Sequence, residues 1–242
     1  MRLDQAVAAR FPDISRRKAR ELIAERRVLV NDRPVAMASR EVADDARIVI
    51  IDDVPDLAIL RETAEWVAVN KPAGLPTQPT RDREQRSLEE LLRMKYRQIF
   101  LVHRIDTPTS GAVLFARTQR EAARLSELFA KREIRKTYVA RISGSIEGEL
   151  TIDTPVDGKE ALTIVRPIGE SLVEAEIRTG RTHQIRVHLA SIGHPVAGDR
   201  RYGGALLDAS RLMLHAWKLE HASIGVIEAP LPDDLIRFAS PA

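Results

Sequence analysis

Apolar residues near the amino terminus recur at the spacing of a helix. Within residues 3–11 they occupy every third or fourth position, so they share one face, and Pro12 ends the segment. Residues 16–27 repeat this period, and Ser15 stands where a helix N-cap is expected. The outward face of this second predicted helix is basic, with arginines at positions 16, 17, 20 and 27.

Shorter apolar runs in the same part of the chain predict three strands. These runs are residues 28–32, 33–39 and 46–52, and a turn at Asn31–Pro34 joins the first two. An acidic, proline-containing stretch at 51–60 then has the composition of a linker. We therefore expect two domains, residues 1–55 and residues 60–236.

Beyond the linker, strands and helices alternate irregularly. Residues 65–76 predict a strand that runs into a Pro/Gly turn, residues 118–133 predict an amphipathic helix, and residues 173–193 predict a strand followed by a helix. Further strands are predicted at 111–117 and 135–144. This order favours an α+β fold with a mixed, largely antiparallel sheet over a doubly wound parallel sheet.

The composition of the 242-residue chain is that of an ordinary globular protein, with 44% hydrophobic and 30% charged residues. The absence of cysteine excludes disulfides, thiol nucleophiles and zinc–thiolate sites. No apolar run reaches the roughly 20 residues of a membrane helix. The amino terminus is charged and lacks the apolar core of a signal peptide. We expect a cytoplasmic protein with no membrane partner.

The net charge of +3 is unevenly distributed. Residues 1–40 contain ten Lys or Arg against five Asp or Glu, a net charge of +5, so the remainder carries −2. Basic charge concentrated at one end indicates a polyanionic partner, most simply a nucleic acid. A solvated helix face explains the same charge equally well.

The segment 101–116 places a polar group between two apolar runs. His103, Arg104 and Asp106 stand together, and the turn-forming stretch 107–111 follows. Charged residues between apolar segments are usually paired or functional. Asp106 is either a turn cap or a reactive carboxylate.

Six segments of the second region resemble the RluA-type family of RNA pseudouridine synthases, which isomerise uridine within RNA. The segments are residues 70–74, 103–111, 135–140, 179–188, 193–199 and 214–216. Ile105 stands where leucine is commoner in that family. The first 50 residues resemble the S-four-type RNA-binding domain, although Arg27 precedes Val28 where glycine is usual.

The resemblance implies three catalytic residues. Asp106 would act on the ribose, either by attacking or stabilising the anomeric carbon, as carboxylates do in retaining glycosidases, or by removing a ribose proton. Arg186 would keep that carboxylate ionised and oriented. Tyr138 would stack on the target base. A surface arginine and a core aromatic are the alternative interpretations of the last two.

The resemblance also implies an RNA-binding set. Arg104 would help to extrude the uridine, because a stacked base is out of reach of any carboxylate. Phosphate contacts are expected from His103, Lys71 and Arg181. The basic helix adds Arg16, Arg17 and Arg20. Each of these side chains could instead belong to an ordinary solvated surface.

Metal and cofactor sites are not expected. The six histidines include no pair at metal-binding helical spacing with a neighbouring glutamate, and the reaction is a rearrangement that needs no redox partner or group donor. Ribosomal RNA is the favoured substrate and transfer RNA the second, acted on by a monomer. The competing hypotheses are a non-catalytic RNA-binding or ribosome-assembly protein and a nucleoside hydrolase.

Overall fold

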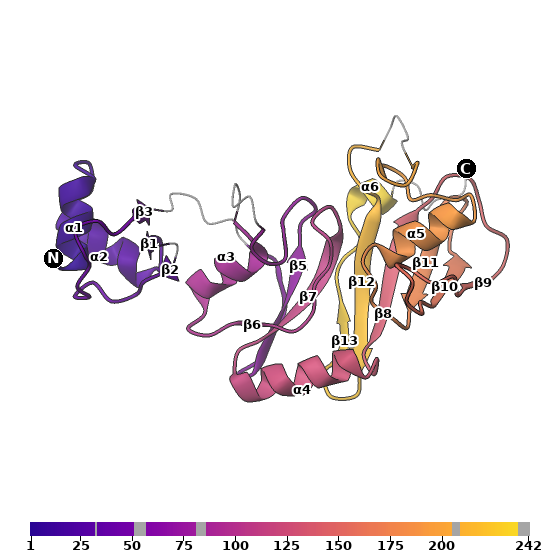
Figure 1. Ribbon diagram of the computed structural model, residues 1–242, viewed down its shortest axis with the longest axis horizontal. Coiled ribbons are helices and arrows are strands. Elements are labelled where there is room, and N and C mark those ends of the chain that lie inside the picture. The colour runs from indigo at the N-terminus through magenta and orange to yellow at the C-terminus, as the bar shows by residue number, and fades with distance from the viewer. Residues whose placement is uncertain (32, 51–56, 81–85, 205–208, 237–242) are drawn as a thin grey trace. The chain divides into compact units, whose positions relative to one another are not determined.

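A computed structural model describes residues 1–31, 33–50, 57–80, 86–204 and 209–236 (Figure 1). The chain divides into two compact units. The amino-terminal unit is Met1–Asp56 with Glu89–Ile99, and the carboxy-terminal unit is Leu57–Leu88 with Phe100–Ala242. No helix in the described ranges has the length and apolar character needed to cross a membrane.

Two helices and a small sheet form the amino-terminal unit. The helices are α1 (Leu3–Arg10) and α2 (Arg16–Ala24), and the sheet has the order β2 (Arg33–Pro34), β1 (Val28–Val30), β3 (Ile48–Ile50). The side chain of Ser15 accepts a hydrogen bond from the backbone of Lys18, so the predicted N-cap of α2 is confirmed. The apolar faces of both helices are buried together with the strands.

The second strand is shorter than the predicted 33–39. After Val35 the backbone turns toward the start of α1, where the amide nitrogens of Leu3 and Asp4 donate to the carbonyls of Arg40 and Ala38. These two bonds satisfy amides at a helix end, which have no partner within the helix. Residues 51 and 52, at the end of the predicted strand 46–52, and residues 51–56 of the predicted linker lie outside the described residues.

Helix α3 (Leu88–Lys95) does not appear among the predicted elements. From Glu89 onward it groups with the amino-terminal unit, and the guanidinium of Arg26 donates to the carbonyls of Arg93 and Tyr96 at 3.1 and 2.7 Å. The predicted domain limit of 1–55 leaves these residues out. The limits 1–55 and 60–236 themselves stay predictions.

In the described residues, the carboxy-terminal unit is built on a ten-stranded sheet. Eight strands follow one another in the order β4 (Ile59–Glu62), β5 (Trp66–Lys71), β7 (Ser110–Ala116), β12 (Leu214–His221), β8 (Arg135–Arg141), β11 (Leu172–Ile177), β10 (Thr163–Pro167) and β9 (Leu150–Ile152). The other two are β6 (Phe100–Leu101), paired with β7, and β13 (Gly225–Glu228), paired with β12. All named pairs are antiparallel except β7 with β12, which confirms the predicted fold class.

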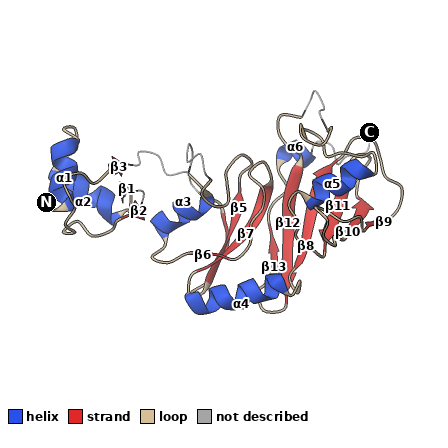
Figure 2. Cartoon of the chain, viewed as in Figure 1, coloured by secondary structure: helices blue, strands red, loops and turns tan. Residues whose placement is uncertain are grey.

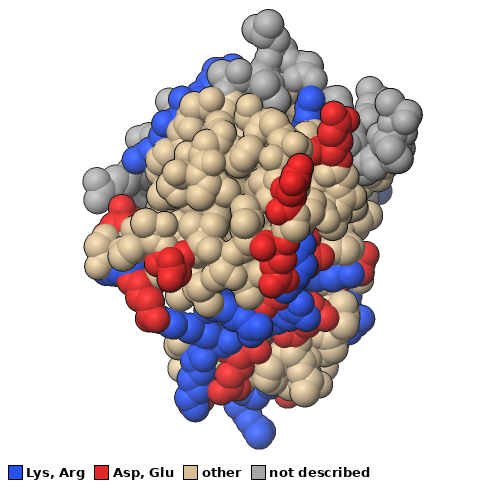
Figure 3. All heavy atoms as spheres, turned by 90° about the vertical axis from the view of Figure 1, so that its right-hand side faces the viewer, with Lys and Arg blue, Asp and Glu red and all other residues tan. Residues whose placement is uncertain are grey.

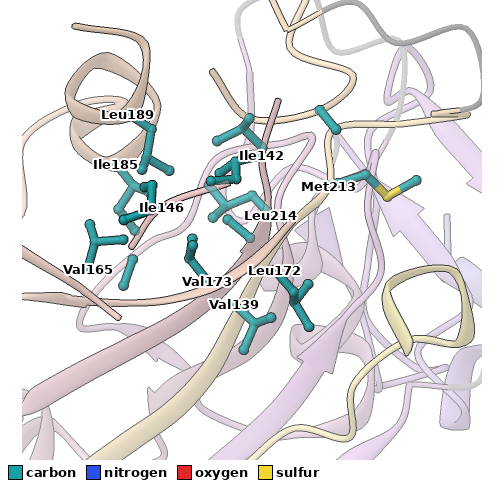
Figure 4. Packing of buried hydrophobic residues seen from close by; sticks show 14 of the residues in the cluster. Val139, Ile142, Ile146, Val165, Leu172, Val173, Ile185, Leu189, Met213 and Leu214 are labelled. Atoms are coloured by element: carbon teal, nitrogen blue, oxygen red, sulfur yellow. The ribbon is translucent and has the colours of Figure 1, made fainter. Parts of the chain in front are cut away.

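Three further helices belong to the same unit as this sheet (Figure 2). They are α4 (Gln119–Ala130), α5 (Gln184–Ser191) and α6 (Asp233–Ile236). In α5, Ile185 and Leu189 are buried in a core cluster with Val165 of β10, Val173 of β11 and Leu214 of β12 (Figure 4). Burial of these two side chains fixes how α5 is rotated against the sheet. The rotation of α5 in turn determines where its polar side chains lie.

The parallel junction of β7 and β12 requires a glycine. Gly111 has φ +118°, and a Cβ atom there would lie 2.2 Å from the carbonyl oxygen of Ala216. Beside it, the hydroxyl of Ser110 hydrogen-bonds Nδ1 of the buried His215 at 2.9 Å. Both contacts hold the start of β7 against β12, immediately after the segment that carries Asp106.

Candidate active site

A pocket of about 510 Å³ opens in the carboxy-terminal unit. It lies between the segment before β7, the end of α4, the middle of β8 and the start of α5. Its size is in the range of small-molecule sites. The sequence predicts seven site residues in this unit, and all except Lys71 line the pocket. The six are Asp106, Tyr138, Arg186, Arg104, His103 and Arg181.

Asp106 and Arg186 meet in this pocket although 80 positions separate them in sequence. Nη1 of Arg186 lies 3.8 Å from Oδ2 of Asp106, which is an ion-pair distance but too long for a hydrogen bond. The side chain of Asp106 is 23% exposed and that of Arg186 only 7%. The carboxylate is therefore open to a ligand, whereas the guanidinium lies behind it.

Asp199 holds that guanidinium, a role that the sequence did not predict. Nε and Nη2 of Arg186 donate to the two carboxylate oxygens of Asp199 at 2.6 and 2.8 Å. Asp199 is buried and also accepts from the backbone amides of Arg201 and Tyr202. Burial opposes ionisation of both side chains, but their mutual contact outweighs it, raising the pKa of Arg186 and lowering that of Asp199. The guanidinium is thus permanently charged and fixed in direction.

His183 is a second neighbour of Asp106 that the sequence did not assign. Its Nε2 lies 3.7 Å from Oδ2 of Asp106, and its Nδ1 lies 3.0 Å from the hydroxyl of Tyr202. Burial lowers the pKa of His183, Asp106 opposes this shift, and Arg186 reinforces it. His183 also has the left-handed backbone angle φ +57° at the N-cap of α5, and residues held in such angles often belong to functional sites.

Tyr138 is partly buried in the wall of the pocket. On β8 it stands between Ala175 of β11 and Ala216 of β12, whose small side chains share its face of the sheet. Burial and the negative charge of Asp106 raise the pKa of the phenol above its usual value, so the hydroxyl stays protonated at neutral pH. A flat ring with space beside it suits stacking on a base.

The pocket is electropositive. Its described lining contains Arg104, Arg132, Lys136, Arg181 and Arg186 but only one carboxylate, that of Asp106. Elsewhere on this unit, Figure 3 shows basic and acidic side chains interleaved. Such an excess of cations at one concave site favours a polyanionic ligand.

Among these cations, Arg104 is exposed, whereas two others are tied to the backbone. Lys136 Nζ donates to the carbonyl of Thr179 at 2.9 Å, and Arg181 Nε donates to that of Glu160 at 2.9 Å. Burial, reinforced by Arg132, lowers the pKa of Lys136 to about 8. The sequence did not single out Lys136 or Arg132 as site residues.

His103 lines the pocket as a neutral side chain. Its Nε2 accepts a hydrogen bond from the backbone amide of Leu114 at 2.8 Å, and its ring stacks on Phe129 at 4.3 Å. Burial, with a smaller effect of Lys136, lowers the pKa of His103 to about 3. An uncharged ring with these contacts supports the segment before β7 and offers no cation to a phosphate.

Lys71 is the predicted phosphate ligand that does not reach the pocket. It is completely buried at the end of β5, where its Nζ donates to the carbonyls of Pro72, Leu75 and Thr107 at 3.0, 2.6 and 3.1 Å. Burial lowers the pKa of Lys71 to about 7, although Asp106 opposes the shift. All three N–H groups of the ammonium are used within the protein, so Lys71 ties the turn after β5 to the residue that follows Asp106.

We predict that Lys71→Met destabilises the carboxy-terminal unit. The three partly buried carbonyls would lose their donor, at a cost of up to about 1–3 kcal/mol each, and a displaced Thr107 would shift Asp106 and lower kcat. Thermal unfolding monitored at the two tryptophans measures the first effect, and kcat on the RNA substrate that the sequence resemblance implies measures the second. The matched control is Lys159→Met, because Lys159 is exposed. Normal stability with only a raised KM would instead make Lys71 a phosphate ligand.

The three predicted RNA-binding arginines of α2 belong to the amino-terminal unit. Nε of Arg16 and Nε of Arg20 donate to the carboxylate of the buried Asp4, whereas the side chain of Arg17 is 92% exposed.

Within the described residues, no group of three or more histidine, aspartate or glutamate side chains is placed to hold a metal ion.

The carboxy-terminal unit thus combines a mixed, largely antiparallel sheet with a cationic pocket that contains one partly exposed carboxylate. The profile described as RNA pseudouridylate synthase matches residues 65–191, and the S4 domain profile matches residues 1–48. The chain belongs to the RNA pseudouridylate synthase family, whose members are isomerases, and it carries an S4 domain. The predicted family, fold and reaction class are confirmed.

Curated relatives extend the similarity over nearly the whole chain. Ribosomal large subunit pseudouridine synthase D of Escherichia coli strain K12 is 33% identical over an alignment covering 98% of this chain and 89% of that protein. The protein of the same name from Nitrosomonas europaea is 32% identical, with 97% and 82% covered. An uncharacterized RNA pseudouridine synthase of Bacillus subtilis, YhcT, is 35% identical, with 77% and 72% covered.

A solved structure agrees in the fold. Human RNA pseudouridylate synthase domain containing 1 superposes with a TM-score of 0.64 at 27% sequence identity. The superposition covers 79% of this chain and 89% of the human chain.

Proposed function

We propose that this enzyme converts uridine to pseudouridine in the RNA of the large ribosomal subunit. The relatives that cover 97–98% of the chain, S4 domain included, are named for that substrate. Transfer RNA is the second candidate. The proposal includes a monomer in the cytoplasm, with residues 1–55 as the RNA-binding domain and residues 60–236 as the catalytic domain.

The observation that carries the catalytic proposal is the pairing of Asp106 with Arg186 inside a cationic pocket. The carboxylate is partly exposed to the pocket, and the guanidinium stands 3.8 Å behind it. This arrangement supports a catalytic role for Asp106 over turn capping. Arg186, Asp106 and Tyr138 all line the same pocket, which supports an enzyme over a non-catalytic RNA-binding protein.

The reaction moves the attachment of the ribose from nitrogen N1 to carbon C5 of the uracil ring. The bond from C1′ to N1 breaks, the base turns, a bond from C1′ to C5 forms, and the proton lost from C5 is balanced by the proton gained at N1. Asp106 acts on the sugar while the base is detached, either as a nucleophile or stabilising anion at C1′ or as a base toward a ribose proton. Both routes use the same carboxylate, and the positive charge of Arg186 lies 3.8 Å from it.

Tyr138 and Arg104 act on the base and its surroundings in this proposal. The Tyr138 ring stacks on the detached uracil and keeps it in the pocket while it turns. Arg104 is exposed at the pocket, where its guanidinium fills the space vacated by the flipped nucleotide and offsets part of the few kcal/mol that unstacking costs. Arg181, Arg132 and Lys136 bind the flanking phosphates.

Tritium release from RNA labelled at uracil C5 tests this function. We expect the enzyme to release label from a large-subunit ribosomal RNA transcript without cutting the chain and without freeing uracil. Free uracil would indicate the hydrolase alternative, and binding without release of label would indicate the non-catalytic one. A transfer RNA pool run in parallel tests the second substrate.

A further inference from the structure

His183 lies beside Asp106, but the proposed function gives it no role. Its side chain lines the pocket and is 17% exposed, and its Nε2 lies 3.7 Å from Oδ2 of Asp106. This separation is too long for a hydrogen bond. Within the described residues, the hydrogen bond of the ring is made by Nδ1, so Nε2 stays available to a nucleotide in the pocket.

Contacts on the far side of the His183 ring fix its direction. Nδ1 lies 3.0 Å from the hydroxyl of Tyr202. The guanidiniums of Arg186 and Arg201 lie 5.1 and 5.6 Å from the centroid of the Tyr202 ring, and these cation–π contacts hold the phenol in place. With the hydrogen on Nδ1, the imidazole donates to the phenol oxygen and keeps a lone pair on Nε2. The fixed ring then presents its basic nitrogen to the pocket.

The last step of the proposed reaction needs a proton acceptor. Once C1′ is bonded to C5, the proton on C5 leaves and its electron pair forms the C5=C6 double bond. The electrons of the N1=C6 double bond move to N1, which takes up a proton from water. At this stage C5 is bonded to the sugar carbon at which, or beside which, Asp106 acts. A base 3.7 Å from Asp106 is therefore within reach of the C5 proton.

Three other titratable side chains of the pocket are poor proton acceptors at neutral pH. Burial raises the pKa of Tyr138, so its phenol keeps its proton. Burial lowers the pKa of Lys136 to about 8, so it is still mostly an ammonium, and it donates to a backbone carbonyl. Burial lowers the pKa of His103 to about 3, and its Nε2 already accepts from a backbone amide. In the described lining, His183 and Asp106 are the groups that remain.

We propose that His183, oriented by Tyr202, is the general base that removes the proton from C5 of the rearranged uracil. The inference rests on the proposed function, because it assigns one step of that reaction. Burial lowers the pKa of His183, so the ring is neutral and able to accept a proton near pH 7. The imidazolium that forms lies 3.7 Å from Asp106, whose carboxylate stabilises it. Arg186 and Arg201 disfavour that charge, so the proton then passes to water.

The decisive test is His183→Asn in the full chain. Asparagine adopts the left-handed angle φ +57° of this position, and its amide nitrogen takes the place of Nδ1. The backbone and the contact with Tyr202 are therefore kept while Nε2 is lost. We expect single-turnover tritium release from RNA labelled at uracil C5 to slow by about 10²-fold or more, as on loss of a general base. A folded His183→Asn protein with the wild-type rate would overturn the proposal.

The matched control is His221→Asn. His221 ends β12 outside the pocket lining, and its Nδ1 likewise bonds a hydroxyl, that of Ser223 at 2.8 Å. This variant loses the same ring and should release tritium at the wild-type rate. Thermal unfolding reports the fold of each variant.

A hydrogen isotope effect separates proton transfer from a merely structural role of His183. Deuterium at C5 should slow pseudouridine formation by His183→Asn more than it slows the wild type, because loss of the base makes cleavage of the C5–H bond limiting. His183→Gly also tolerates the positive φ and leaves space where the ring was, so added imidazole should restore part of its rate. An isotope effect no larger than that of the wild type would overturn the proposal, because another group, such as Asp106, would then take the proton.

Tyr202→Phe tests the positioning role of the phenol. Phenylalanine keeps an aromatic ring against Arg186 but loses the hydroxyl that faces Nδ1 of His183. We expect kcat to fall by about tenfold, the effect of one hydrogen bond, with KM unchanged and a larger isotope effect at C5. A wild-type kcat would show that Tyr202 does not orient the base.

Two failures remain distinguishable in this design. Absence of tritium release and of pseudouridine by the wild-type enzyme would contradict the proposed function, whatever the variants show. Normal wild-type turnover together with a full rate for the folded His183→Asn protein would contradict the role of His183 alone.

Discussion

Asp106→Asn is expected to lower the rate of pseudouridine formation by at least about 10⁴-fold, the scale at which a central catalytic group acts. The amide has the shape of the carboxylate but can neither attack a carbon nor hold a proton taken from the ribose. The fold should survive, because the nearest basic side chains, Arg186 and His183, lie 3.8 and 3.7 Å from the carboxylate rather than at hydrogen-bond distance. Single-turnover tritium release with excess enzyme measures the chemical step.

The control for this variant is Asp153→Asn, which removes an exposed carboxylate from the same unit. It should leave the rate unchanged. A rate for Asp106→Asn within tenfold of wild type would show that the reaction does not depend on this carboxylate, and the proposed mechanism would then be wrong.

Arg186→Ala is expected to abolish turnover and also to destabilise the carboxy-terminal unit, by about 3–5 kcal/mol. From the sequence alone this variant is expected to stay folded. The structure changes that expectation, because Arg186 is the ion-pair partner of the buried Asp199 as well as the neighbour of Asp106. Its removal leaves an uncompensated charge in the interior. Chemical or thermal unfolding measures the loss of stability.

A double variant separates the two roles of Arg186. Arg186→Met with Asp199→Asn removes both buried charges, so much of the stability should return, as it does when a buried ion pair is replaced as a whole. Turnover should stay absent, because Asp106 still lacks its cation. An active double variant would show that Arg186 matters only for folding.

The elements with a clear local period were the predictable part of the fold. Ser15 and the apolar period after it locate α2, and the apolar run of 111–117 locates β7. Helix α3 lies in a stretch to which the sequence interpretation assigned no element. The second strand of the small sheet is shortened by hydrogen bonds to the start of α1, which no local pattern encodes.

The site was predictable where the family resemblance assigns a residue its role, and not where tertiary contacts decide that role. Asp106, Arg186 and Tyr138 come from that resemblance, and one pocket contains all three. Lys71 ends an apolar strand, where a lysine normally reaches solvent, but here three carbonyls from two segments surround it. Asp199 follows a glycine like an ordinary turn residue, and only the fold reveals that it binds Arg186.

The clamp between Arg186 and Asp199 has a consequence for the motion of the catalytic group. Two of the three guanidinium nitrogens are committed to Asp199, and only Nη1 faces Asp106, across 3.8 Å. Because no direct hydrogen bond joins them, the carboxylate can rotate toward the sugar and back without breaking one. Coulomb attraction declines only gradually with separation, so the stationary cation compensates the acid throughout such an excursion. Arg186 therefore balances the charge of Asp106 in each position that the carboxylate takes during a turnover.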